Sequence, residues 1–260
     1  TQILVIPGNH DINRSSAAGF YGDGYELVDS INKEEFAKIY QDYGLQESIE
    51  KDDTSLSYLY RARKDFFILM LDSNSHGTNE ISDQTFSWIE EILKDAKEQD
   101  IQVLAVSHQN LLAHNPYFTE GFLIHRAQEL EAFYEKYDVL ANLSGHIHIQ
   151  HIEDGGLPEI LTSALPVSPH HYGILELDGE TLDYQAKILD VASWAREQGL
   201  TDQNLLVFSQ ASRAFMEQVA ARKLESELLD SQLTSLEREL LLQTFAKLNA
   251  EYFAGRQIDP

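Results

Sequence analysis

Residues 2–11, Gln-Ile-Leu-Val-Ile-Pro-Gly-Asn-His-Asp, decide the fold predicted for this chain of 260 residues. The apolar run that ends at Ile6 is typical of a buried strand, and the Pro-Gly pair after it ends the strand. Three polar side chains follow: the amide of Asn9, the imidazole of His10 and the carboxylate of Asp11. In α/β sheets, ligand sites lie at the ends of strands. A polar turn that caps a helix uses the same residue types, so these three residues alone leave both interpretations open.

Two more apolar runs end in residue types that bind metals. The first ends at Ser107-His108, and the second leads into residues 145–148, Gly-His-Ile-His. On an extended strand, residues two positions apart point to the same side, so His146 and His148 would both reach neighbouring metal ions. A lone His-x-His pair is more often found on a surface edge strand. Three donor-rich segments at predicted strand ends together indicate a transition-metal site that handles phosphate.

The order of the predicted elements indicates an α/β fold. Strands are expected at 2–6, 57–62, 66–71, 101–106, 139–143, 147–152, 159–163, 172–177 and 182–189, and helices at 33–43, 82–99 and 127–136. The first half alternates strand and helix, whereas the second half is rich in strands. We therefore expect two stacked sheets with helices on the outer faces, an α-β-β-α sandwich.

The last part of the chain changes character. Residues 203–228 and 234–254 are predicted to form two amphipathic helices, and Gly255 is a suitable stop for the second one. The apolar stripe of the second helix consists of Leu236, Leu240, Leu241, Phe245, Leu248, Tyr252 and Phe253. We expect a main domain over 1–192 and a helical appendix over 193–260, packed as an αα-hairpin. The alternative is a cap that narrows the mouth of the site.

Composition restricts the possible partners. A net charge of −24 argues against a nucleic-acid polymer as the main partner, because binding to its phosphates is driven by Lys and Arg. A small phosphate ester stays possible, since bound metal ions dominate the local field of such a site. Cysteine is absent, which removes disulfides and thiolate zinc sites. The sequence contains no run of 18 apolar residues, so it predicts no membrane span in this segment. Any targeting segment would lie upstream of Thr1, so a cytoplasmic and an exported protein are both compatible with the sequence.

The order Gly-Asn-His-Asp, then His, then Gly-His-x-His resembles the signature of the calcineurin-like metallophosphoesterases. The chain is also similar to a bacterial branch described as cyclic-nucleotide phosphodiesterases with a helical C-terminal domain. The segments that carry this second likeness are Val5–Asn13, Ser55–Leu59, Leu143–His148, Pro169–Gly173, Trp194–Ala195 and Asn204–Leu206. The resemblance extends over nearly the whole chain.

The resemblance implies a dinuclear site of manganese, iron or zinc. The substrate that it implies is a small phosphate ester of the nucleotide or cyclic-nucleotide type. The ligands it implies for one ion are Asn9, His108 and His146, and the ligand it implies for the other ion is His148. His10 resembles the catalytic histidine that assists the leaving group, and Asp11 its orienting partner. The family mechanism is attack by a metal-bridging hydroxide in line with the leaving oxygen.

The chain departs from the family pattern at its start. The motifs Asp-x-His and Gly-Asp normally precede Gly-Asn-His, but only seven residues precede Gly8. The single Gly-Asp pair, Gly22-Asp23, is best interpreted as a loop turn. We therefore expect an N-terminally truncated domain that binds at most one metal ion and is impaired when alone. Loss of the first strands would expose a sheet edge and favour a homodimer or strand exchange.

Two other functions are compatible with the sequence. A noncatalytic binding or scaffold domain would keep the fold without the missing motifs. A mononuclear hydrolase of amides or esters is disfavoured, because Asn is an unusual ligand there and no catalytic carboxylate is evident. Two further histidines, His114 and His170, are candidates for lining the substrate pocket.

Overall fold

The computed structural model describes residues 2–255 apart from 22, 23, 117, 118, 120, 180 and 230. The chain divides into two compact units. The N-terminal unit consists of the chain up to His146 together with Ile152–Leu161, and the C-terminal unit consists of Ile147–His151 and the chain from Thr162 onward. The predicted domain boundary between 192 and 193 lies inside the C-terminal unit and stays a prediction.

The N-terminal unit is built on a mixed sheet of seven strands in the order β3-β4-β5-β6-β7-β9-β8. The strands are β3 (Glu50–Lys51), β4 (Tyr58–Arg63), β5 (Phe66–Leu71), β6 (Gln102–Ser107), β7 (Asn142–Ser144), β8 (His151–Asp154) and β9 (Pro158–Leu161). Strands β3, β4 and β5 are antiparallel, whereas β5, β6, β7 and β9 run parallel. The mixed α/β class is confirmed. The parallel register brings the carboxyl ends of β6 and β7 to the same edge, which places the residues that follow them side by side.

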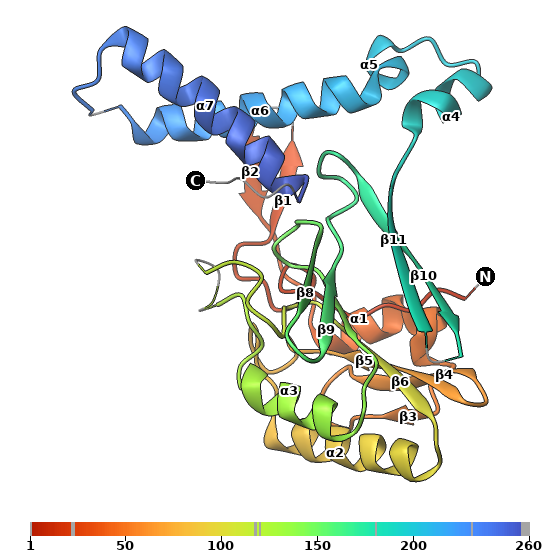
Figure 1. Ribbon diagram of the computed structural model, residues 1–260. Coiled ribbons are helices and arrows are strands. Elements are labelled where there is room, and N and C mark those ends of the chain that lie inside the picture. The colour runs from red at the N-terminus through yellow and green to blue at the C-terminus, as the bar shows by residue number, and fades with distance from the viewer. Residues whose placement is uncertain are drawn as a thin grey trace. The chain divides into compact units, whose positions relative to one another are not determined.

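Two helices, α2 (Asp83–Glu98) and α3 (Ala127–Lys136), pack together with this sheet (Figure 1). Both agree with the sequence prediction. Ser82 caps α2 by accepting a hydrogen bond from the backbone N–H of Thr85. The inner face of α2 is buried as its apolar periodicity predicts, and its core residues are Phe86, Ile89, Ile92 and Leu93.

The strand predicted at 2–6 is not formed. A ladder needs a neighbour that pairs residue after residue, and this segment makes single contacts instead: the N–H of Val5 donates to the carbonyl oxygen of Tyr43 at 3.1 Å. The side chains of Leu4 and Ile6 pack against Tyr58. Leu4, Val5 and Ile6 are partly buried and Ile3 is 53% exposed, so the apolar run forms neither a paired strand nor a buried one.

The strand geometry predicted around the Gly-His-Ile-His segment is also wrong. The predicted strand 139–143 is shortened and shifted to β7, and β8 begins only at His151. Between them the backbone turns at two histidines, with φ of 65° at His146 and 58° at His148. Ile147 and Ile149 are buried, so the alternation of apolar and polar residues holds without a strand.

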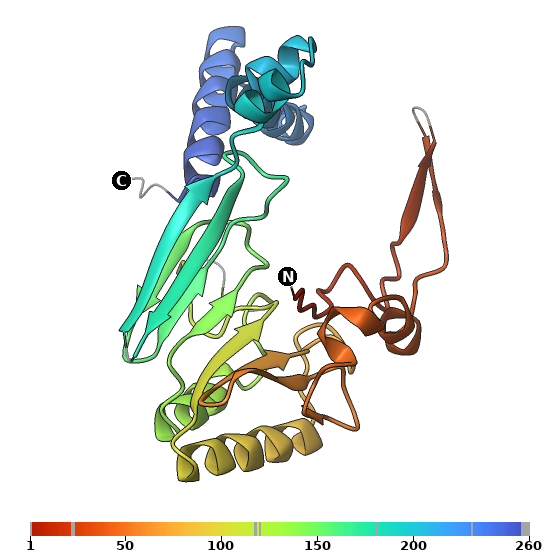
Figure 2. The ribbon, with the colours of Figure 1, turned by 90° about the vertical axis from the view of Figure 1, so that its right-hand side faces the viewer.

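A short helix and a hairpin precede the sheet. Helix α1 (Lys33–Ile39) confirms the first part of the predicted helix, with a capping box between Asn32 and Glu35, and a π-helical turn over Gln41–Leu45 follows it. Figure 2 shows that the hairpin of β1 (Ala18–Tyr21) and β2 (Gly24–Leu27) extends away from the rest of its unit. The Gly22-Asp23 pair lies outside the described residues.

The C-terminal unit contains a two-stranded hairpin and four helices. Its elements are β10 (His171–Asp178), β11 (Thr181–Ile188), α4 (Val191–Glu197), α5 (Gln203–Leu206), α6 (Phe208–Glu227) and α7 (Ser235–Phe253). The helix predicted at 203–228 is interrupted at Val207, whose φ of −122° and ψ of 38° are not helical. Helices α6 and α7 pack against each other, as the αα-hairpin predicts. None of the helices in the described part of the chain is both long and apolar enough to cross a membrane.

The buried face of α7 is not its leucine stripe. Ala246 and Ala250 are its buried residues, whereas Leu236 is 75% and Leu240 is 63% exposed. Gly255, with φ of 72°, follows the helix as predicted.

Asp52 makes the stability of the N-terminal unit depend on pH. Burial favours its neutral form, but hydrogen bonds from Ser55, Thr85 and Thr54 outweigh burial and hold the pKa of Asp52 below its usual range. A lowered pKa means that the ionised form stabilises the fold at pH values above about 3.9, and that this stabilisation is lost as the pH falls through the lowered pKa.

We expect Asp52→Asn to lower the free energy of unfolding by about 1–3 kcal/mol at pH 7. The difference from the wild type should shrink below about pH 4, because Asp52 then takes up a proton in the unfolded state first, and in the folded state as the pH falls through its lowered pKa. Urea denaturation at pH 7 and pH 3 measures both values. Asp53→Asn, at an exposed neighbour, is the control and should change neither. A difference that stays constant over this range would contradict the assignment.

Candidate metal centre

The Gly-Asn-His-Asp segment forms a tight turn that its own residues close. The N–H of Gly8 donates to Oδ2 of Asp11 at 2.7 Å, and the N–H of Asp11 donates to the carbonyl oxygen of Gly8 at 3.0 Å. The Nδ2 of Asn74, which follows β5, donates to the carbonyl oxygen of Pro7 at 3.1 Å. The turn therefore presents the side chain of Asn9 toward the sheet edge from a fixed backbone.

A buried pair of side-chain amides, Asn74 and Gln109, supports this turn. Asn74 and Gln109 exchange two hydrogen bonds, and the hydroxyl of Ser73 donates to Oε1 of the same glutamine. All three residues are almost fully buried, so their hydrogen bonds are satisfied by the protein and not by solvent. Because Gln109 follows His108 directly, this pair connects the turn to the end of β6.

Three donor atoms converge at the carboxyl ends of β6 and β7. Nε2 of His108 lies 3.0 Å from Oδ1 of Asn9 and 3.2 Å from Nδ1 of His146. Ligands held 2.0–2.2 Å from one ion are about 3.0 Å apart at a right angle and about 3.4 Å apart in a tetrahedron. The two distances from His108 are therefore compatible with binding of one metal ion.

The left-handed backbone at His146 turns its ring toward His108. Nδ2 of Asn110 donates to Oγ of Ser144 at 3.0 Å and to the carbonyl oxygen of Gly145 at 3.1 Å. The N–H of Gly145 donates to the carbonyl oxygen of His108 at 3.1 Å. These bonds join the two loops that carry the histidines.

Glu159 is a part of the site that sequence reasoning missed. Its carboxylate is fully buried and accepts hydrogen bonds from the N–H of Leu111 at 2.8 Å, from the N–H of Leu112, from Nδ2 of Asn142 at 2.7 Å and from Nε2 of His114 at 3.1 Å. It thus holds the loop after His108 against β7. The signal in the sequence was a charged residue in an apolar strand, Pro158–Leu161. The side chain of His114 is fully buried and is engaged in this contact with Glu159.

The remaining predicted residues are placed differently. His10 is exposed next to Asn9, and the carboxylate of Asp11 bonds to Gly8, with no hydrogen bond to His10 in the described residues. His148 belongs to the C-terminal unit, where it lines a pocket together with His170. Within the described ranges no cluster of three or more His, Cys, Asp or Glu side chains is present. The trio of Asn9, His108 and His146 is not such a cluster, because it contains only two histidines and its third donor is the amide oxygen of an asparagine.

Gly8 is required by the close approach of His108. A Cβ atom at Gly8 would lie 2.7 Å from Cε1 and 2.9 Å from both ring nitrogens of His108. Gly8→Ala should therefore push the imidazole away from Asn9 and weaken binding of Mn²⁺ about 10–100-fold in calorimetric titration. Gly155→Ala is the control, because a Cβ there meets no atom within 4 Å. Equal affinities for the two variants would contradict the argument.

Comparison with known proteins identifies the family. The calcineurin-like phosphoesterases match residues 1–150, which is more than half of the chain. The chain belongs to the calcineurin-like phosphoesterase family. Residues 190–259 of the chain also match the C-terminal domain of cyclic nucleotide phosphodiesterase. The family implies divalent metal ions, and the trio of Asn9, His108 and His146 has the chemistry to hold one.

Among solved structures, the chain matches a dimetal phosphatase from Danio rerio, at 13% identity and a TM-score of 0.49. A second match is to GAP50, the anchor in the inner membrane complex of Plasmodium, at 14% identity and a TM-score of 0.34. These matches cover 61% and 57% of this chain, and 66% and 51% of the respective relatives, so the chain spans at most about two thirds of their length. No curated protein matches the chain.

Proposed function

We propose that this chain is part of a metal-dependent phosphodiesterase. The observation that carries the proposal is the convergence of Asn9, His108 and His146, with donor atoms 3.0 and 3.2 Å apart. One amide oxygen and two imidazoles suit Mn²⁺, iron and Zn²⁺. Their place at the carboxyl edge of a parallel sheet, in a phosphoesterase family, makes a phosphoryl group the proposed ligand.

The chain's own residues divide into ligands and a proton donor. Asn9, His108 and His146 would hold one ion, and a role of His148 as a ligand of a second ion stays a prediction. Divalent ions at such a site supply Lewis-acid stabilisation of the charge that develops on the phosphoryl oxygens. His10 is exposed beside Asn9, so its imidazole can reach a bound substrate and give a proton to the departing oxygen. Asp11 accepts a hydrogen bond from the N–H of Gly8 and so fixes the turn that carries His10. That its carboxylate also orients the imidazole of His10 directly stays a prediction.

The proposed substrate is a small phosphodiester of the cyclic-nucleotide type. The match of residues 190–259 to the C-terminal domain of cyclic nucleotide phosphodiesterase supports this choice. The net charge of −24 supports a small ester over a nucleic-acid polymer.

Metal content and hydrolysis of bis-p-nitrophenyl phosphate test the proposal. They are measured on this chain and on a version extended upstream through the two expected carboxylate motifs. We expect this chain to hold about one ion weakly and turn over slowly, and the extended version to hold about two ions and be active. If the extended version with manganese is inert, the enzymatic function is wrong and a binding or scaffold role takes its place.

The predicted homodimer is tested separately. Light scattering of this chain should give twice the monomer mass if a second copy pairs at an exposed sheet edge. A clean monomer at all concentrations would exclude it.

A further inference from the structure

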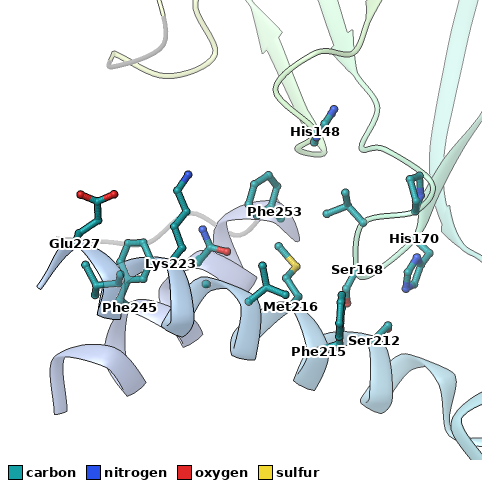
Figure 3. A pocket seen from close by; sticks show the side chains of 16 residues that line it. His148, Ser168, His170, Ser212, Phe215, Met216, Lys223, Glu227, Phe245 and Phe253 are labelled. Carbon is teal, nitrogen blue, oxygen red and sulfur yellow. The ribbon is translucent and has the colours of Figure 1, made fainter. Parts of the chain in front are cut away.

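A pocket of about 500 Å³ lies within the C-terminal unit (Figure 3). Its walls come from residues 166–170, from His148 and from helices α6 and α7. Figure 3 shows His148 on the wall opposite the two helices. A volume of this size is typical of sites for small organic ligands.

Most of the lining is apolar and aromatic. The side chains that provide it include Phe215, Met216, Val219, Leu224, Phe245 and Phe253. Phenylalanine faces and a polarisable methionine suit a flat ring, which stacks on them at low entropic cost. The face is open on one side, since Phe215 is 67% and Phe245 is 37% exposed. An apolar surface that a folded unit leaves to solvent in this way favours an incoming planar group.

Two polar groups in the lining lack partners within the described residues. Nε2 of His170 is buried without a hydrogen bond, while Nδ1 of the same ring lies 2.8 Å from the carbonyl oxygen of Leu165. Nδ1 must carry the proton to donate to a carbonyl, so Nε2 is an acceptor. A buried acceptor without a hydrogen-bond donor destabilises the folded unit. A small movement of the neighbouring side chains would let an N–H group of a ligand donate to Nε2 of His170 and remove this destabilisation.

The second group is Lys223, whose ammonium forms no ion pair among the residues described. In a chain with a net charge of −24, a lysine without a carboxylate partner at a pocket favours an anionic ligand. Glu227 lies one turn further along α6 and can accept hydrogen bonds from ligand hydroxyls.

We propose that this pocket binds a nucleotide, with an amino-bearing base against the phenylalanines and His170 and with its phosphate at Lys223. The inference goes beyond the proposed function, because every residue of this pocket belongs to the C-terminal unit and its contact for the phosphate is Lys223. It needs no metal ion, so binding can be measured apart from hydrolysis.

Calorimetric titration of the chain in EDTA tests the pocket with adenosine 5′-monophosphate, adenosine and ribose 5-phosphate. We expect the nucleotide to bind saturably, adenosine to bind about tenfold more weakly, and ribose 5-phosphate to show no measurable binding. Phe215→Ala should weaken the nucleotide and adenosine alike, about tenfold. Lys223→Gln should lower the affinity for the nucleotide to that for adenosine, and the affinity for adenosine should stay unchanged.

The variants are chosen so that folding does not confound them, because Phe215 and Lys223 are exposed side chains. Lys187→Gln on β11 is the matched control and should bind like the wild type. Absence of saturable nucleotide binding, equal binding of ribose 5-phosphate, or indifference to both pocket variants would overturn the proposal. If the chain binds the nucleotide but the extended version does not hydrolyse diesters, the proposed enzymatic function is wrong and the proposed nucleotide pocket stands.

Discussion

Replacing His108 by alanine should lower Mn²⁺-dependent diester hydrolysis at least about 100-fold in the extended version of the chain. His108 is the centre of the trio, since its Nε2 lies within 3.2 Å of both other donor atoms. Without it, Asn9 and His146 would have to hold the ion alone. Calorimetry on the chain itself should show the same loss as weaker Mn²⁺ binding, which separates a ligand role from a role in chemistry alone.

His76→Ala is the matched control for this experiment. His76 is exposed in the loop after β5, and its removal should change neither metal affinity nor turnover. If His108→Ala keeps the metal affinity of the control, His108 is not a ligand and the proposed centre is wrong. Unchanged helical circular dichroism in both variants ensures that the comparison is made between folded proteins.

Replacing Glu159 by glutamine should lower the free energy of unfolding by about 3 kcal/mol. The carboxylate has four donors around it and no contact with solvent. Glutamine replaces one acceptor oxygen by an NH₂ group, which faces N–H groups and leaves them without a partner. Each such buried group costs roughly 1–3 kcal/mol.

Glu159→Gln should also weaken Mn²⁺ binding about tenfold, because the loop after His108 loses its connection to β7. Urea denaturation and calorimetric titration measure the two effects. Glu50→Gln, at an exposed position of β3, is the control and should change neither. An unfolding midpoint equal to that of the control would mean that the carboxylate does not hold this loop.

The contrast between α2 and residues 2–6 shows where sequence reasoning succeeds. Helix α2 is determined by local rules: a serine cap directly before its 16 residues and apolar side chains at helical spacing within them. The run 2–6 has an equally clear apolar pattern, but a strand also needs a partner, and that requirement is not written in the segment itself. The predicted buried strand is therefore wrong in both respects: Ile3 is 53% exposed, Leu4 to Ile6 are only partly buried, and no strand pairing forms.

The sequence by itself determined the α/β class, the helices α2 and α3, and the chemical identity of the donors Asn9, His108 and His146. Only the tertiary structure decided that these donors lie 3.0 and 3.2 Å apart, and that Glu159 holds the loop next to them. It also decided that His148 and His170 line one pocket and that the leucines of α7 are exposed. The physical reason is range: periodicity and capping act within a few residues, whereas a site joins segments about 100 residues apart through sheet register and buried hydrogen bonds.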